Sequence, residues 1–489
     1  MRKKKNNIIE KTAVVFLLSF CVFVMLASFT DAVIRPDHVT LLQYIFGILT
    51  VGIGVFVIYI LGSRLSEKNL KKLTGIISAA VFFAYIIEIF AVQVQPKVDL
   101  SHIISQSMDM IERGTHEFTN ERYFSFYTNN IPVAIVVYWI FYIGKMLFGE
   151  AVNYSIVGGV FNVVMIWMGI LCFFALIDKV THSYKTAFFY KMLMVFNPVF
   201  FVYASYYYTD TIAIPVSIAA VLCVVTAFQS EKLKKYIFLF FSGILFAAAA
   251  KIRVVTLIIV IAIVVYLIYE GLWKSLFRLL TLFGTAFLIT GFLYGAIYDY
   301  HVPFDTSERE VPITHFLMMG SHGNGTYDNE DVKYTKSIQN PEERKQKTWN
   351  AYVENLKNNG IAGNVKLLLK KEAVWGIGTR GYYQYIKDVK KETFLYQLIA
   401  GEYSGITKGI LQAYNLAVML LIFMGLMHSR HKMSMLQLIL VIYWGGTILF
   451  TAFWEAHPRH IMPYIPFLTL MGIPFAEKFF QKSPVFSRK

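Results

Sequence analysis

The chemistry that this sequence could carry begins with an aspartate that directly follows a long apolar segment. Asp99 closes the sequence Val94-Gln-Pro-Lys-Val-Asp99, immediately after an apolar block near 73–94. A carboxylate at a membrane boundary can act as a general base toward a hydroxyl group. The same residue can equally be a solvated loop acid. Asp109 and Glu112 lie further along the same predicted helix, and on residue type alone they compete with Asp99.

Two further segments combine amides, tyrosines and a carboxylate. Asn129 and Asn130 precede a proline; either amide could cap a helix beginning there, and both could hydrogen-bond sugar hydroxyls. Asp210 closes the segment 203–210, which holds four tyrosines, including Tyr208. Aromatic faces beside a carboxylate suit a sugar or a divalent metal ion, but tyrosines also gather at membrane interfaces for structural reasons. Both interpretations of Asp210 and its tyrosines stay open.

Cations occur where an apolar sequence does not favour them. Lys251 and Arg253 interrupt an otherwise apolar stretch, although a cation at the bilayer centre costs about 2.5–3.5 kcal/mol on insertion scales. Two cations in one turn at the membrane surface can bind a phosphate, Arg through its planar fork and Lys as a point charge. A short segment later in the chain holds Glu455, His457 and Arg459. Its spacing is not a zinc signature, so we expect Arg459 to provide a second anion contact.

The composition defines the class of protein that must position these residues. Of 489 residues, 56% are hydrophobic and only 16% are charged, whereas soluble domains have about 25% charged residues. The apolar residues form blocks about twenty residues long, which is the length of a membrane-spanning helix. These numbers exclude an ordinary soluble enzyme and a disordered chain. The net charge of +15 fits the cytoplasmic excess of Lys and Arg in membrane proteins, so we expect no nucleic-acid partner.

The apolar blocks predict an all-α polytopic membrane protein with about twelve transmembrane helices. They lie near 12–30, 41–61, 73–94, 152–177, 187–205, 211–229, 236–250, 254–269, 279–298, 405–427, 434–453 and 460–477. A further block at 131–148 is predicted to be an interfacial helix. If it crossed the membrane, Lys179 and the basic cluster at 232–235 would leave the cytoplasmic side. It also contains Lys145 and aromatic residues that favour the headgroup level.

This topology places both termini in the cytoplasm of a multi-pass protein of the cell membrane, and the polar segments outside. We divide the chain into an N-terminal transmembrane bundle at 1–298, an extracytoplasmic loop region at 299–403 and C-terminal transmembrane helices with a cytoplasmic tail at 404–489. The first large outer loop is 95–150, and 299–403 is expected to be of mixed and helical structure. No phosphate-binding loop with the Gly-Lys-Ser/Thr pattern is present, which argues against ATP-driven transport.

The order of these segments resembles the GT-C superfamily of integral membrane glycosyltransferases, in particular bacterial family-39-like (protein mannosyltransferase-like) proteins. The similar stretches are Pro96-Lys-Val-Asp99, Tyr123 to Pro132, Tyr203 to Asp210, Lys251, Pro312 to Tyr327, and Arg459-His-x-x-Pro463. Together they cover most of the chain from about residue 73 onward. The resemblance implies a sugar donor linked to polyprenyl phosphate and an acceptor outside the membrane, which could be a cell-wall polymer, a glycolipid or a protein.

The resemblance also implies roles for particular residues. Asp99 would be the base of an inverting transfer, and Asp210 would be the residue to hold a divalent metal, if one is used. The residue types themselves, as argued above, would have Lys251, Arg253 and Arg459 bind the phosphate. Two other interpretations stay open: a polysaccharide ligase or polymerase, which would share the outer site, and a transporter or flippase of lipid-linked sugars. Transporters usually carry their polar residues at mid-membrane, whereas these gather at one face.

Overall fold

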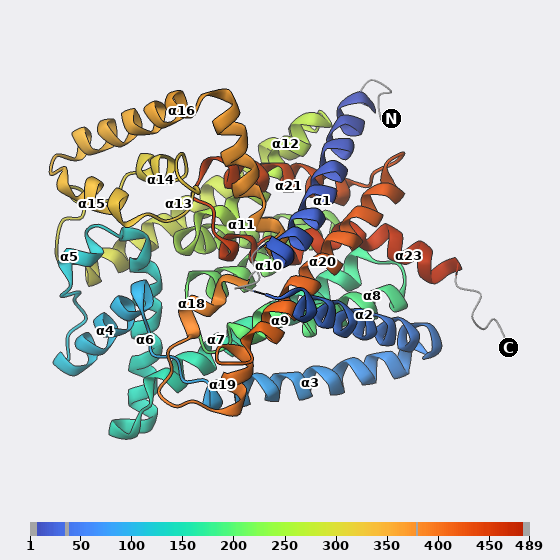
Figure 1. Ribbon diagram of the computed structural model, residues 1–489, viewed down its shortest axis with the longest axis horizontal. Coiled ribbons are helices and arrows are strands. Elements are labelled where there is room, and N and C mark those ends of the chain that lie inside the picture. Colours follow the sequence, from blue (N-terminus) through green and yellow to red (C-terminus); the bar gives the residue numbers. More distant parts are fainter. Residues whose placement is uncertain (1–6, 35–38, 378–379, 483–489) are drawn as a thin grey trace.

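The computed structural model describes residues 7–34, 39–377 and 380–482, and within these ranges the chain is built from helices. The described residues form no strand; a single isolated bridge pairs Val94 with Val389. Long helices make a bundle, and shorter helices gather at its left-hand end in Figure 1. The N-terminal helices are α1 (Asn7–Ile34), α2 (Leu41–Arg64), α3 (Glu67–Ala91), α4 (Val98–Arg113), α5 (Glu121–Phe124), α6 (Ile131–Phe148), α7 (Tyr154–Val180), α8 (Tyr184–Val195) and α9 (Pro198–Val202).

Further helices of the bundle follow the short helix α9. They are α10 (Thr209–Phe228), α11 (Lys232–Ile252), α12 (Ile258–Tyr269), α13 (Trp273–His301), α20 (Ser404–Ser429) and α21 (Met435–Phe453). Short helices α22 (Ile465–Thr469) and α23 (Ile473–Lys482) follow them. In the described part of the chain, ten helices are long and apolar enough to cross a membrane. A helix satisfies its own backbone hydrogen bonds, which is what a hydrocarbon environment requires. The chain is therefore an all-α polytopic membrane protein, as predicted.

Three of the twelve predicted spans are not long continuous helices. The segment 187–205 is broken between α8 and α9, because Asn197 caps α9 and Pro198 has no N–H to continue the ladder. The segment 460–477 is divided by prolines into two short α-helices and two 3₁₀ turns. The segment 254–269 begins with a 3₁₀ turn, which leaves α12 only 12 residues long. Because all three segments are mostly apolar, a count of hydrophobic blocks did not reveal these breaks.

The predicted interfacial helix corresponds to α6. By length and composition its segment, Thr128–Ala151, is one of the ten helices that could cross a membrane. In Figure 1, however, α6 runs crosswise to α3 at the end of the bundle where the short helices gather. Its packing partners are α4 and α7. This direction agrees with a helix that lies along the surface of a membrane spanned by α3, so the interfacial placement remains our prediction.

Close backbone contact joins the two ends of the chain. A Cβ on Gly47 of α2 would lie 2.4 Å from the backbone oxygen of Gly409 in α20, and a Cβ on Gly409 would lie 2.4 Å from the Gln43 backbone oxygen. Only glycine fits such a crossing, in which small residues let two membrane helices approach. This contact fixes the N-terminal helices against the C-terminal ones, and both groups border the polar site described below.

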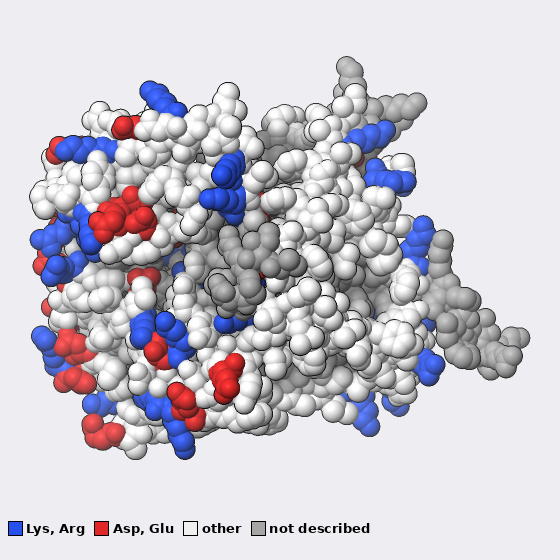
Figure 2. Space-filling model, in the orientation of Figure 1, with Lys and Arg blue, Asp and Glu red and all other residues white. Residues whose placement is uncertain are grey.

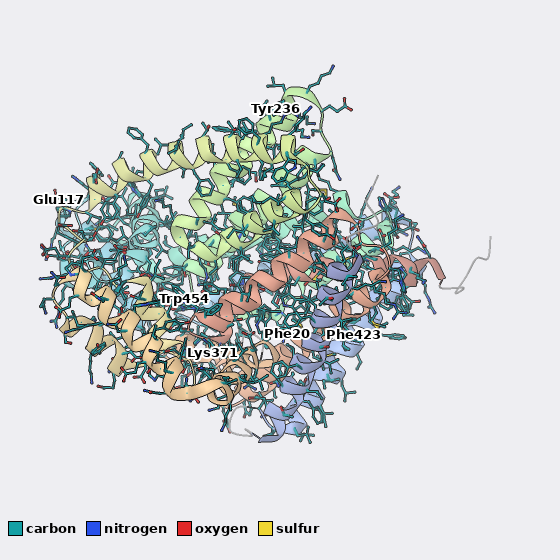
Figure 3. The ribbon with its side chains drawn as sticks, turned by 90° about the horizontal axis from the view of Figure 1, so that it is seen from above. Phe20, Glu117, Tyr236, Lys371, Phe423 and Trp454 are labelled. Atoms are coloured by element: carbon teal, nitrogen blue, oxygen red, sulfur yellow. The ribbon has the colours of Figure 1, made fainter. Side chains whose placement is uncertain are left out.

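The region after α13 is helical throughout its regular elements. Its helices are α14 (Ile313–Met319), α15 (Asn329–Ser337), α16 (Pro341–Glu372), α17 (Val374–Ile377), α18 (Tyr383–Ile386) and α19 (Phe394–Ile399). Gly360, with φ 61°, bends α16 into two segments. Lys371, at the end of the second segment, is buried and donates to the carbonyls of Gly320 and Ala452, both at 2.7 Å. Figure 3 shows Lys371 and Trp454 where this region meets the bundle.

Charged side chains are distributed unevenly over the molecule. On the face shown in Figure 2, acidic and basic residues both crowd the end that carries α4, α5 and α14–α16. The middle is largely uncharged, and mainly Lys and Arg mark the opposite end. A band without charge between two charged ends is the pattern of a protein that spans a bilayer. We call the first end the site end, because the polar cluster described next belongs to it.

Candidate functional site

Asp99 lies in the first turn of α4, where two tyrosines donate hydrogen bonds to its half-buried carboxylate. The Tyr123 hydroxyl donates to Oδ1 at 2.6 Å, and the Tyr208 hydroxyl donates to Oδ2 at 3.0 Å. Burial, followed by the charge of Asp99, raises the pKa of Tyr123, so this phenol keeps its proton. These two phenol donors hold the carboxylate in a fixed orientation. The sequence did not single out Tyr123, because only folding brings α5 to α4.

Asn130 completes this network instead of capping α6. Its side chain makes no capping hydrogen bond, although Asn130 occupies the N-cap position of α6. Nδ2 donates to the Tyr123 oxygen at 2.7 Å, and Oδ1 accepts from the Tyr208 hydroxyl at 2.8 Å. Asn129 reaches only Asn130, at 3.5 Å. Of the two roles considered for these amides, the structure therefore excludes side-chain capping by Asn130 and places it among polar groups.

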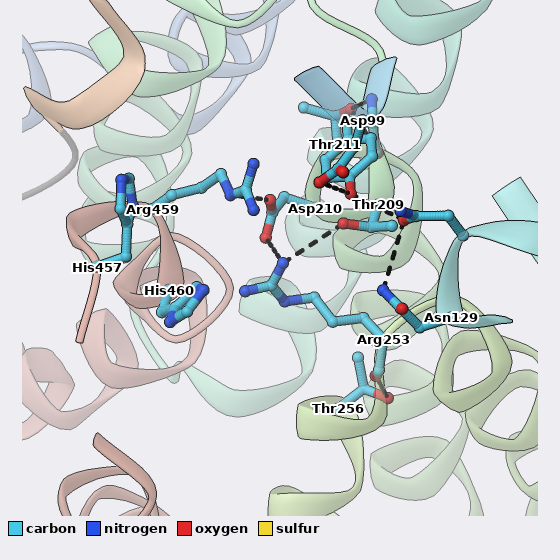
Figure 4. A network of polar contacts seen from close by, with 12 residues as sticks. Asp99, Asn129, Thr209, Asp210, Thr211, Arg253, Thr256, His457, Arg459 and His460 are labelled. Atoms are coloured by element: carbon cyan, nitrogen blue, oxygen red, sulfur yellow. Dashed lines mark hydrogen bonds and ion pairs between the residues drawn. The ribbon is translucent and has the colours of Figure 1, made fainter. Parts of the chain in front are cut away.

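Asp210 lies close by, in the first turn of α10, between two arginines. Arg253 Nη1 forms an ion pair with Asp210 Oδ1, and Arg459 Nε lies 3.1 Å from Oδ2 (Figure 4). Asp210 is only 2% exposed. Arg253 Nη1 also donates to the Thr209 hydroxyl at 3.4 Å. Two guanidinium groups against one carboxylate leave one positive charge in excess, which is the electrostatic condition for binding an anion.

Arg459 is held between two aromatic rings. Its guanidinium carbon lies 5.0 Å from the centre of the Tyr208 ring and 4.8 Å from that of Tyr385. Such stacking favours Arg over Lys, because the guanidinium is planar and weakly hydrated. Tyr208 thus contacts Asp99 through its hydroxyl and Arg459 through its ring. Tyr385 was missed from the sequence, where it is one of several tyrosines with no diagnostic spacing.

The segment before Arg459 contacts the backbone of this arginine through His457. His457 Nδ1 accepts a hydrogen bond from the Arg459 backbone N–H at 3.1 Å, and its Nε2 lies 2.8 Å from the Gln384 amide. Burial, helped by Arg459 and Arg253, lowers the pKa of His457 to about 3. The imidazole is therefore neutral, and because Nδ1 accepts a hydrogen bond, its proton lies on Nε2.

Glu455 faces the same region without touching either aspartate. Its Oε1 lies 3.9 Å from Nε2 of His460. Burial raises the pKa of Glu455, although Arg459 opposes this effect. Glu455 and His457 thus border the cluster, which is formed by Asp99, Asn130, Asp210, Arg253 and Arg459.

Other candidates from the sequence stand apart from this cluster. Lys251 is exposed at the end of α11, with its ammonium 4.6 Å from the centre of the Tyr294 ring, so it does not share a clamp with Arg253. Asp109 is engaged by Arg113 at 2.7 Å, and Glu112 is exposed. Among the acids of α4, Asp99 alone receives the two tyrosine hydroxyls.

The surroundings of Asp210 do not suit a metal cation. Both of its oxygens face guanidinium groups, which would repel a divalent ion. Among the described residues, the only cluster with metal-ligand potential is His322, Asp328 and Asp331, whose ligand atoms lie within 4.8 Å of one another. That cluster includes neither Asp99 nor Asp210. We therefore derive no chemical step through a metal.

A cavity of about 720 Å³ lies next to this cluster, between α1, the second segment of α16 and the loop before Arg459. His457 lines it, together with apolar side chains such as Val365 and Leu369 and with Lys366 and Lys370. Its wall on α1 includes Asp31, which is held by Arg380 in a buried ion pair at 2.6 Å. A mainly apolar cavity with cations at its rim suits an amphiphilic anion.

The ten apolar helices and the polar cluster at one end define an integral membrane protein with a prepared site for polar chemistry. The family model described as "Conserved hypothetical integral membrane protein" matches residues 1–478, so the chain belongs to that family. No curated protein matches the sequence.

Among solved structures, the chain is similar to ArnT from Cupriavidus metallidurans in two states. The structure bound to undecaprenyl phosphate has 12% identity and a TM-score of 0.39, over 84% of this chain and 79% of that one. The apo structure has 11% identity and a TM-score of 0.35, over 84% of this chain and 78% of that one. Likeness at this level does not define a substrate.

Proposed function

We propose that this protein is a membrane glycosyltransferase that moves a sugar from a polyprenyl-phosphate donor to an acceptor hydroxyl on the extracytoplasmic side. The observation that carries the proposal is the double contact of Tyr208. Its hydroxyl binds the candidate base, Asp99, and its ring stacks on the candidate phosphate ligand, Arg459. A base and an anion-binding cation held by one side chain are what a displacement at a glycosyl phosphate requires.

The reaction follows from these positions. Asp99 accepts the proton of the acceptor hydroxyl while that oxygen bonds to the anomeric carbon of the donor. The bond from the anomeric carbon to the phosphate oxygen breaks, and its electron pair leaves with the polyprenyl phosphate. A single displacement inverts the anomeric configuration. Asp99 then returns the proton to water.

Arg459 and Arg253 stabilise the phosphate as negative charge develops on it. Removing one preorganised donor to a developing anion typically lowers kcat by about 100- to 1000-fold. Asp210 has a positioning role in this proposal, because it holds both guanidinium groups in a buried setting. A phosphate that enters the cluster would meet the excess positive charge without having to order either arginine.

The cavity beside His457 would admit the lipid part of the donor. Its apolar walls suit a prenyl chain, while Lys366 and Lys370 lie at headgroup level in the predicted topology. The acceptor would approach Asp99 from outside the membrane. Cell-wall polymers, glycolipids and proteins all offer a hydroxyl of the required kind.

The proposal is tested with purified protein in lipid and a panel of radiolabelled polyprenyl-phosphate sugars. We expect wild-type turnover, measured as loss of label from the lipid, and its abolition in Asp99→Asn with donor binding largely retained. Asp109→Asn is the matched control, because it changes the same residue type on the same helix outside the network. Near-normal turnover in Asp99→Asn, or its loss in Asp109→Asn, would refute the assignment of the base.

A further inference from the structure

A second cavity opens at the other end of the bundle, away from the candidate site. It measures about 580 Å³ and lies between α10, α12, α21 and the short helices α22 and α23. Apolar side chains from each of these elements form its walls, among them Val224, Ile263, Leu440, Phe467 and Ile473. It shares no lining residue with the cavity beside His457.

The rim of this second cavity is basic. Lys179, at the end of α7, and Lys432, just before α21, are exposed and line it, and in the described residues neither ammonium has an ion-pair partner. One carboxylate, Glu477, lies on the rim, where it accepts the His182 backbone N–H at 2.7 Å. The rim therefore carries an excess of positive charge.

Contacts between segments distant in sequence hold the rim in place. The Gln229 side chain donates to the Lys179 carbonyl at 2.9 Å, which joins the ends of α7 and α10. The bond from His182 to Glu477 joins the same turn to α23. The two lysines on the rim can bind a charged headgroup, and the apolar walls below them can bind an acyl chain. Both parts of a lipid-binding site are therefore present.

We infer that this cavity binds an anionic glycerophospholipid of the cytoplasmic leaflet, with an acyl chain between the helices and the phosphate at Lys179 and Lys432. Basic pockets between membrane helices on the cytoplasmic side bind anionic headgroups through this combination of charge and apolar surface. The apolar walls favour a lipid over a free anion, and the two lysines favour an anionic over a zwitterionic headgroup. This inference is independent of the proposed reaction.

The test uses the full-length protein in nanodiscs that contain phosphatidylglycerol with a photoreactive acyl chain. After irradiation, mass spectrometry identifies the labelled peptides. We expect label in 221–228, 259–263 and 435–440, with about tenfold less in the double variant Lys179→Gln/Lys432→Gln, because each lysine near an anionic headgroup strengthens binding. Both lysines are exposed, so this variant should fold normally.

Two controls decide the outcome. Lys68→Gln/Lys72→Gln removes two exposed lysines of α3 at the same end and should leave the labelling unchanged. Phosphatidylcholine with the same photoreactive chain should label the cavity weakly and without dependence on Lys179 and Lys432. Equal labelling by both lipids, unchanged labelling in the Lys179/Lys432 variant, or label confined to other peptides would overturn the inference.

Discussion

Tyr208 joins the two halves of the candidate site, and its two functions can be separated. Tyr208→Phe removes the hydroxyl that donates toward Asp99 and Asn130 but keeps the ring over Arg459. A hydrogen bond to a charged group is worth about 1.5–3 kcal/mol, so we expect kcat to fall about 10- to 100-fold with little change in donor KM. Tyr207→Phe is the control, because the Tyr207 hydroxyl has no partner among the described residues. An equal loss in both variants would contradict this role.

Substitution of Arg459 tests the part of the candidate site that is proposed to bind the donor phosphate. Arg459→Lys keeps the positive charge but loses the planar group that stacks between Tyr208 and Tyr385. A desolvated cation–π contact is worth about 2 kcal/mol, so we expect donor KM in the transfer assay to rise about tenfold or more. Arg113→Lys, in the exposed pair with Asp109, should leave donor KM unaltered. An unchanged KM in Arg459→Lys would remove this residue from donor binding.

The low pKa of His457 makes the stability of the folded protein depend on pH. Its pKa of about 3 in the folded protein lies below the ordinary value of about 6.5, so between these limits the unfolded chain binds a proton that the folded chain does not. Stability should therefore fall as the pH decreases from about 6.5 toward 3. His457→Asn keeps a hydrogen-bond acceptor without a titrating group.

The measurement is the thermal unfolding midpoint at pH 7 and pH 5. We expect a smaller drop in His457→Asn than in the wild type, and a wild-type drop in His431→Asn, which changes an exposed histidine before α21. Identical drops in all three proteins would contradict the neutral state of His457.

Most residues of the candidate cluster could be named from the sequence, but their grouping could not, and their roles stay predictions. Asp99, Asn130, Asp210, Arg253 and Arg459 were recognised because polar residues beside apolar blocks are conspicuous, and the structure brings them into one cluster. Lys251 was placed in the clamp because it lies two residues from Arg253. Lys251 still belongs to α11 and lies against Tyr294 of α13, whereas Arg253 follows the end of α11 in an extended conformation. The spacing of the two residues does not show where α13 lies.

At the scale of elements, the buried Lys371 is one of the contacts that hold α16 against the bundle, beside the hydrogen bond from Thr451 to Glu372. Lys371 donates to two backbone carbonyls, and burial lowers its pKa to about 8. Lys371→Met leaves both carbonyls without this donor, at a cost of about 1–3 kcal/mol for each buried unsatisfied group. We expect faster amide hydrogen exchange in 313–372, while helices of the bundle exchange as in the wild type.

The neighbouring substitution is the control for that experiment. Lys370→Met removes a lysine of the same helix that is exposed and makes only a long contact with Asn324, at 3.4 Å. Its exchange pattern should match the wild type. Protection of 313–372 that survives in Lys371→Met would show that other contacts hold the region in place.

Helices were predicted well where a long apolar segment contains no helix-breaking or capping residues. They were predicted poorly where an apolar segment is interrupted by such residues. The long spans such as 152–177 and 405–427 appear as α7 and α20. The segment 187–205 was taken as one span because its residues are apolar, yet Asn197 and Pro198 end one helix and begin another. These two residues were visible in the sequence, and capping rules would have located the break.

At the scale of the whole molecule, the predicted topology places the site end outside the cell. After replacement of Cys21, Cys172 and Cys223, a single cysteine can report the side of each exposed position. We expect a membrane-impermeant maleimide to label Glu354→Cys on α16 in intact cells. Lys68→Cys on α3 should react only after permeabilisation.

The two positions control for each other, because both side chains are exposed. The reverse pattern would invert the protein in the membrane and remove the extracytoplasmic site. Labelling of both in intact cells would show that the probe had entered.

The distribution of the site along the chain has a consequence for how the protein is made. Asp210 and Arg253 are synthesised early and can already neutralise each other, whereas Arg459 follows only after α20 and α21. Before Arg459 is synthesised, Asp210 and Arg253 balance each other and carry no surplus positive charge with which to hold a phosphate. Under the proposed function, a nascent or truncated chain would not bind the polyprenyl-phosphate donor, so the ability to bind it would arise in a single late step of biosynthesis.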